Sequence, residues 1–214
     1  MSIGKNGIHG GLSGKTGPVV GYYRLGKWVV RSLPIKTQKN KSGTEAQNIY
    51  RRKFKMAHQF LKPILHVIRM GYREVSMIHQ ATGYNLAMTH LLNEVFIENK
   101  AMDYAKVCIS QGSLPPLSPV NLSFTEAEIE LTWDPKHPLN SQGTTDQLLV
   151  LVYDPAQRKV LFQGTDVGRS KGKASIPITI QVNAPSNFHV WVACINDTRT
   201  KVSNSQYVGI VTIG

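Results

Sequence analysis

The pattern of hydrophobic and polar positions divides the chain into three segments. In the first, residues 1 to 43, two short apolar runs at 19–23 and 28–30 lie on either side of the sequence RLGK. Two β-rich runs joined by a short turn that contains glycine predict a β-hairpin. Because a two-stranded hairpin is marginal alone, we expect it to pack on the rest of the chain or on another subunit. The glycines of residues 9–17 are expected to form a flexible segment that lets the backbone approach something closely.

The second segment, residues 44 to about 100, has a helical pattern. Thr44 and Gln47 have the spacing of a capping box, which predicts a helix start. Apolar residues then recur at helical intervals as far as Pro63, which is expected to kink or break the helix. A later helix is expected to carry four apolar residues on one face: Leu91, Leu92, Val95 and Phe96. Two or three helices make a marginal core, so we expect them to pack on neighbouring strands.

The third segment changes to short apolar runs at regular spacing. It opens with GSLPPLSP, whose three prolines predict a linker or an edge strand. Seven runs follow, which favours a β-sandwich; they span residues 120–124, 129–133, 147–154, 159–164, 174–180, 188–196 and 205–213. In the sixth run, alternation should direct Phe188, Val190, Val192 and Cys194 to one face and His189, Trp191 and Ala193 to the other. The predicted fold class is therefore α+β: a hairpin arm and helical region over residues 1–112, then a seven-stranded sandwich over residues 113–214.

Charge is distributed unevenly over these segments. Residues 1–55 hold 12 Lys and Arg but only one acidic residue, Glu45, whereas residues 113–214 hold 8 basic and 8 acidic residues. Such asymmetry is typical of a region that meets an anionic partner. In the hairpin the basic residues are interleaved with aromatic ones. The candidate partner-binding residues are Lys15, Tyr22, Tyr23, Arg24, Lys27, Trp28, Arg31, Arg51 and Arg52.

The sequence contains no recognisable motif of catalysis or cofactor binding. Gly14-Lys15-Thr16 resembles the end of a phosphate-binding loop, but the glycine required five positions before Gly14 is His9. Ser13 lacks the context of a nucleophile elbow. The aspartates at 134, 146, 154 and 166 are expected to serve turns. We therefore expect no enzyme, no cofactor and no small-molecule substrate.

Histidines and cysteines are also expected to be structural. His58, His66, His79 and His90 lack the spacing of a metal site, so no metal is expected. Cys108 and Cys194 each lie in an apolar run and are expected to be small buried residues without a disulfide. No apolar run approaches a membrane span, and no Sec signal peptide is recognisable. We expect a soluble protein that is cytoplasmic at synthesis.

Two resemblances add to these expectations. The sequences IELTWDP, with Trp133, LLVLVYD and SQYVGIVTI resemble a fibronectin type III domain, in which the tryptophan is a core residue and the fold serves as a spacer or binding module. The whole chain, through GGLSGKTGPVVGYYRLGKWVVRSLP and TEAQNIYRRKF, resembles an uncharacterised family of Bacteroidota proteins of about this length. Proteins with a similar arm and helix look like components of phage-like structures.

Two functions from different classes remain open. The first is a structural subunit of a homo-oligomer or larger assembly, whose arm docks on a neighbouring subunit and buries Tyr22, Tyr23 and Trp28. The second is a nucleic-acid-binding protein whose basic segment follows phosphates, although no recognised nucleic-acid-binding motif is present. One exposed stripe of Arg24, Lys27, Arg31, Arg51 and Arg52 would favour binding, and a division between faces would favour assembly.

Overall fold

The computed structural model describes residues 3–4, 11–33, 43–98, 100–125, 128–136, 145–164, 167–178 and 186–213. The chain forms two compact units, Met1–Asn48 and Ile49–Gly214. The division therefore falls after residue 48, whereas the sequence pattern predicted a boundary at residue 112. The loop expected at residues 36–43 lies outside the described residues except for Gly43.

The first unit contains a four-stranded antiparallel sheet, which we call the arm sheet. Its strands are β1 (Ile3–Gly4), β2 (Leu12–Thr16), β3 (Val19–Arg24) and β4 (Lys27–Ser32), in the order β1-β2-β3-β4. The predicted hairpin is confirmed as β3 and β4. Part of the glycine segment that we expected to be flexible is instead β2, which pairs with β3. No helix follows β2, as a phosphate-binding loop would require.

The first helix, α1 (Glu45–Leu61), begins and ends where the sequence predicted. The Thr44 hydroxyl accepts from the Gln47 amide at 3.3 Å, and the Gln47 side chain accepts from the Thr44 amide at 3.1 Å. This reciprocal pair is the predicted capping box. The helix stops two residues before Pro63, and α2 (Leu65–Gly71) begins after it.

Three further helical elements follow α2. They are α3 (Arg73–His79), α4 (Gly83–His90) and a π-helical turn, η3 (Leu91–Val95), which continues α4. Leu91 and Val95 are buried as predicted. Phe96, which we expected on the same helix, instead begins strand β5 (Phe96–Ile97), because the chain there pairs with β6 (Ala101–Met102). A short 3-10 turn, η4 (Tyr104–Lys106), leads to the third segment.

The third segment forms two antiparallel sheets from seven strands. One sheet has the order β11-β8-β7 and the other the order β10-β9-β12-β13. The strands are β7 (Val120–Phe124), β8 (Glu128–Trp133), β9 (Gln147–Asp154), β10 (Lys159–Gly164), β11 (Lys173–Pro177), β12 (Ser186–Ile195) and β13 (Gln206–Ile213). Each predicted apolar run therefore contains or overlaps a strand.

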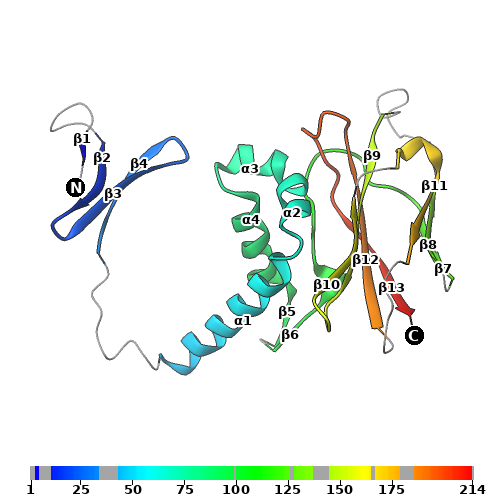
Figure 1. Cartoon of the computed structure of the whole chain (residues 1–214), viewed down its shortest axis with the longest axis horizontal. Coiled ribbons are helices and arrows are strands. Elements are labelled where there is room, and N and C mark those ends of the chain that lie inside the picture. The colour runs from blue at the N-terminus through cyan, green and yellow to red at the C-terminus, as the bar shows by residue number, and fades with distance from the viewer. Residues whose placement is uncertain are drawn as a thin grey trace. The chain divides into compact units, whose positions relative to one another are not determined.

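Strand β12 shows how the helices and the sandwich are joined. Phe188, Val190, Val192 and Cys194 lie in the core between the two sheets, whereas Trp191, Ala193 and Ile195 lie in a second core with the helices. Strand β9 is divided in the same way. The sheet β10-β9-β12-β13 is thus the middle of three layers in the second unit, with helices on one face and the three-stranded sheet on the other (Figure 1). Because the helices share a core with this sheet, they do not form a separate domain.

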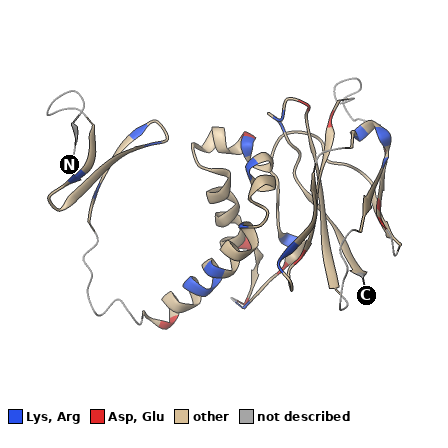
Figure 2. Ribbon diagram, in the orientation of Figure 1, with Lys and Arg blue, Asp and Glu red and all other residues tan. Residues whose placement is uncertain are grey.

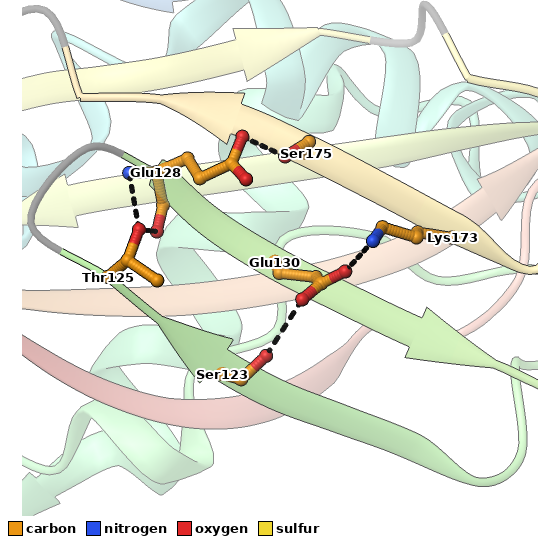
Figure 3. A network of polar contacts seen from close by, with 6 residues as sticks. All are labelled: Ser123, Thr125, Glu128, Glu130, Lys173 and Ser175. Atoms are coloured by element: carbon orange, nitrogen blue, oxygen red, sulfur yellow. Dashed lines mark hydrogen bonds and ion pairs between the residues drawn. The ribbon is translucent and has the colours of Figure 1, made fainter.

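The three-stranded sheet buries one face and exposes the other. Ile129, Leu131 and Trp133 of β8 point into the sandwich core. The outward side chains form a polar network (Figure 3), in which Lys173 pairs with Glu130 and the Ser175 hydroxyl donates to Glu128. Alternation of buried and exposed residues is what an antiparallel sheet with one solvated face requires.

The proline-rich segment before β7 is fastened to the sandwich by a buried arginine. Arg169 is almost fully buried, and its guanidinium donates to the carbonyl oxygens of Pro115 and Pro116 at 2.9 and 3.0 Å. Leu117, the residue after Pro116, lies in the sandwich core. This segment is therefore part of the sandwich and not the linker that its composition suggested.

Candidate functional site

The arm sheet contains seven of the nine predicted partner-binding residues. Its hairpin turns at Leu25 and Gly26, which both have positive φ values, 49° and 79°. Two such residues form the turn type whose twist matches that of paired strands. The turn sets the register, so that Arg24 lies opposite Lys27, Tyr23 opposite Trp28 and Tyr22 opposite Val29.

One face of the arm sheet is apolar, and we call it the aromatic face. Directly opposite residues share a face, so Tyr23 and Trp28 lie together on it with Val30, which is opposite Gly21. The rings of Tyr23 and Trp28 meet edge to face with their centroids 5.1 Å apart. Tyr23 is 60% exposed, Trp28 43% and Val30 58%. A small sheet of this kind therefore exposes three large apolar side chains side by side.

Two glycines allow the aromatic face to close over the backbone. A Cβ atom at Gly11 would lie 1.8 Å from the Trp28 ring, so only glycine leaves room for the indole. A Cβ atom at Gly21 would lie 2.2 Å from the carbonyl oxygen of Leu12. The close approach that the glycine-rich sequence predicted thus occurs within the arm sheet itself.

The opposite face of the arm sheet is basic, and we call it the basic face. Strand register places Lys15 and Arg31 on either side of Val20, and the Arg24–Lys27 pair lies two side chains further along β3 on the same face. All four cations are exposed. The guanidinium of Arg31 lies over the Tyr22 ring, 5.7 Å from its centroid.

No acidic side chain neutralises the basic face from within the first 44 residues of the chain, because that stretch contains neither Asp nor Glu. Figure 2 shows Lys and Arg, and no acidic residue, along the described strands of the arm sheet. The four cations therefore repel one another, weakly at this exposure, and attract an external anion.

The remaining two predicted residues, Arg51 and Arg52, lie on α1 and not on the arm sheet. Both are exposed there. Tyr50 and Phe54, on the same two turns of the helix, are also about half exposed. Of the five residues whose arrangement in one stripe would have favoured nucleic-acid binding, three are joined by strand pairing, while these two belong to the second unit.

A pocket of about 410 Å³ lies in the second unit, beside α3 and α4. It is lined by His79, His90, Glu94, Cys108 and seven other residues, mostly polar. Hydrogen bonding with the Cys108 side chain, assisted by the Lys106 carbonyl and by Glu94, raises the pKa of His90 to about 9 against the opposing effect of burial. The ring nitrogen Nε2 lies 3.0 Å from the Lys106 oxygen and Nδ1 lies 3.3 Å from Glu94. With its pKa raised in this way, the ring is protonated near neutral pH, and its contact with the Glu94 carboxylate is then an ion pair.

This pocket corrects one expectation from the sequence. Cys194 is fully buried as predicted, but Cys108 is only partly buried and lines the pocket. Both His90 and Cys108 line this pocket, and the contact between their side chains is the largest cause of the raised pKa of His90.

Two other histidines make local contacts. His58 shares a 2.6 Å hydrogen bond with the Tyr84 hydroxyl, and His189 one of 2.9 Å with that of Tyr207. Across the described ranges, no three His, Cys, Asp or Glu side chains gather as a metal site would need. Within the same ranges, no helix combines the length and the apolar character needed to cross a membrane.

The sequence did not predict how the arm separates its side chains. Basic and aromatic residues are interleaved in the sequence, which by itself does not show that they lie on different faces. Pairing of β3 with β4 places Tyr23 and Trp28 on one face and the four cations on the other. Counting alternate positions outward from the Leu25–Gly26 turn would have revealed this, because a two-residue turn defines which residues are opposite.

The model of a protein family matches residues 11–209 and is described as a family of unknown function (DUF6266). The match covers the arm sheet from Gly11 onward, the helices and nearly all of the sandwich. Among curated proteins, no match was found.

Proposed function

The chain belongs to this family of unknown function, and we propose that it is a non-enzymatic assembly subunit that docks on a neighbouring subunit through the aromatic face of its arm. The observation that carries the proposal is the exposure of Tyr23, Trp28 and Val30 on one face of a small sheet. Contiguous exposed apolar groups of this kind mark interaction surfaces in soluble proteins. Tyrosine and tryptophan are also the residues most enriched among strong contributors to binding.

The arm requires a partner for a second reason. Among the described residues, neither buried core cluster includes a member of the arm sheet. A sheet this small, with many glycines, buries little apolar surface of its own. Docking the aromatic face would supply the missing burial, at about 25 cal/mol for each Å² removed from water.

The sandwich serves in this proposal as the body that the arm connects. We regard it as similar to a fibronectin type III domain, because three strands in the order β11-β8-β7 face four in the order β10-β9-β12-β13. The buried Trp133 on β8 fits the same interpretation. Such folds serve as spacers or binding modules, although the fold alone does not specify activity. A phage-like particle is one kind of assembly that would use an arm of this type.

Light scattering on the nuclease-treated protein tests the proposal. The intact chain is expected to form an oligomer that persists in high salt, since salt screens charges but spares apolar contacts. Val30→Asp places a charge on the aromatic face, next to Trp28 along β4, and should produce monomers. Val30 is exposed and, unlike Trp28, does not cover a glycine, so the variant should keep the arm folded.

Arg24→Asp is the matched control, because it adds the same side chain to the opposite face of the same sheet. It should leave the oligomer intact. A monomeric intact chain, or an oligomer unaffected by Val30→Asp, would contradict the proposed docking.

A second candidate function, nucleic-acid binding, is favoured by a separate observation. Lys15, Arg24, Lys27 and Arg31 lie together on the basic face, and the first 44 residues contain no carboxylate side chain. The two functions use opposite faces of the arm sheet, so they do not compete for the same side chains.

A further inference from the structure

The arrangement of the cations and aromatic rings in the arm sheet indicates which kind of nucleic acid fits the basic face. We propose that its partner is a double-stranded nucleic acid held by its phosphates, and not an unstacked single strand. This inference rests on the second candidate function, nucleic-acid binding, and is independent of docking through the aromatic face.

The first argument is the position of the aromatic rings. Proteins that bind single strands place aromatic side chains in the same groove as the cations, so that bases stack while phosphates are neutralised. Here Tyr23 and Trp28 are on the aromatic face, because successive residues of a strand point to opposite sides. A strand lying on the basic face cannot stack its bases on them.

The second argument concerns Tyr22, the one aromatic residue on the basic face among the described arm residues. Its ring is partly buried, and the guanidinium of Arg31 lies over it. The ring surface that a base would use is therefore already in contact with a cation of the same face. Tyr22 is therefore better placed to hold Arg31 for contact with a phosphate than to stack against a base.

The third argument is the spacing of the cations. Lys15 and Arg31 are two strand spacings apart, about 10 Å, and the Arg24–Lys27 pair is four residues along β3 from Val20, about 13 Å. A duplex carries a phosphate for about every 1.7 Å of its axis, so about eight lie within that length. The four cations are separated both along the strands and across them. This two-dimensional arrangement matches the two phosphate backbones of a duplex better than the single backbone of one strand.

The shape of the hairpin agrees with this assignment. A two-stranded β-ribbon fits the major groove of B-form DNA, which is about 12 Å wide. The β3–β4 hairpin forms one side of the arm sheet, with β4 at the edge and cations at both ends of its basic face, so this side is the part of the sheet that can enter the groove. The contacts are to phosphates, so we expect affinity without strong sequence preference.

Fluorescence anisotropy with the full, nuclease-treated chain tests the proposal. The probes are a DNA duplex of mixed sequence and about 20 base pairs, an RNA duplex of the same sequence, and the two DNA single strands. We expect a duplex to bind more tightly than either single strand, and the tighter duplex identifies the source. Log affinity should fall against log salt with a slope of about −3.6, from four phosphate contacts.

Single substitutions on the basic face sharpen the test. Lys15→Gln, Lys27→Gln or Arg31→Gln should each reduce the slope by about 0.9 and weaken duplex binding about eightfold at about 0.1 M salt. Lys62→Gln removes one charge from an exposed site outside the arm sheet and should change neither quantity. Tyr23→Ser, on the aromatic face, should leave the slope unchanged.

Three results would overturn the proposal. Single strands that bind as tightly as the duplexes would show that the wrong class was assigned. Loss of binding in Tyr23→Ser, with the slope unaffected by Lys15→Gln and Arg31→Gln, would move the contact to the aromatic face. Binding to no probe would reject nucleic-acid binding itself, whereas the light-scattering result for the aromatic face would stand unchanged.

Discussion

The indole nitrogen of Trp133 donates a hydrogen bond to the main-chain oxygen of Arg169, 2.7 Å away. Trp133 is only 5% exposed and lies in the core between the two sheets, while the side chain of Arg169 holds the proline segment. This hydrogen bond thus connects β8, the second strand of the sandwich, to the turn at Arg169, whose side chain holds the proline-rich segment at the start of the sandwich.

Trp133→Ala is expected to lower the free energy of unfolding by about 3–5 kcal/mol, because it leaves a large cavity in the core. Trp133→Phe keeps much of the volume but loses the hydrogen bond, so a smaller loss of about 1–3 kcal/mol is expected. Chemical denaturation measures both. Equal midpoints for Trp133→Ala and the unaltered chain would show that the ring is not part of the core.

The imidazolium of His90 predicts a loss of stability in mild alkali. Its pKa is raised from 6.5 to about 9 in the folded chain. Its contribution is therefore complete below pH 6.5 and is lost as the pH rises through about 9. We expect the free energy of unfolding to fall by about 1–2 kcal/mol over this window, after allowing for the solvent exposure of Glu94.

The measurement is the denaturant midpoint at intervals between pH 6 and pH 10, for the unaltered chain and for His90→Gln. The difference between the two should shrink as the pH rises, because His90→Gln has no proton to lose. A constant difference across the window would show that the His90 ring is not charged in the folded protein.

Removal of residues 1–42 should leave the second unit folded. The two core clusters begin at Ala57 and at Leu117, and the shortened chain keeps Thr44, which caps α1. We expect the circular dichroism of the sandwich and a cooperative unfolding transition to be retained, with a change in stability within about 0.5 kcal/mol. Loss of cooperative unfolding would mean that the arm is needed for the fold of the second unit.

The two cysteines should differ strongly in reactivity. Burial, the largest cause, raises the pKa of the Cys194 thiol to about 11, and its side chain is fully buried. Cys108 lines the pocket beside α4. Iodoacetamide should therefore add one group to the native protein, at Cys108, since only an accessible thiolate reacts.

Mass spectrometry after trypsin digestion locates the modified residue. Cys108→Ser should remain unmodified until denaturant is added, when Cys194 becomes available. Two groups added at similar rates to the native chain would contradict the burial of Cys194.

Sequence periodicity alone was sufficient for most of the secondary structure. The capping box at Thr44, the helix stop before Pro63 and the sandwich strands depend on neighbours a few residues away, so a local pattern contains them. The hairpin was also predictable from local sequence, because RLGK forms its two-residue turn at Leu25 and Gly26. Phe96 was assigned to the wrong element because its strand exists only through pairing with β6, which a helical pattern cannot reveal.

Only the tertiary structure decided how these elements share their surfaces. Alternation in β12 predicted two faces, and packing determined that both are buried, one against the second sheet and one against the helices. The arm is a second example. The positive charge of residues 1–55 was evident from composition, but its arrangement on the sheet was not. Strand pairing separated Arg31 from Trp28 and so divided one basic, aromatic segment into two surfaces. A period of two is a local property of a strand, whereas the choice of what covers each face depends on residues far away in the chain.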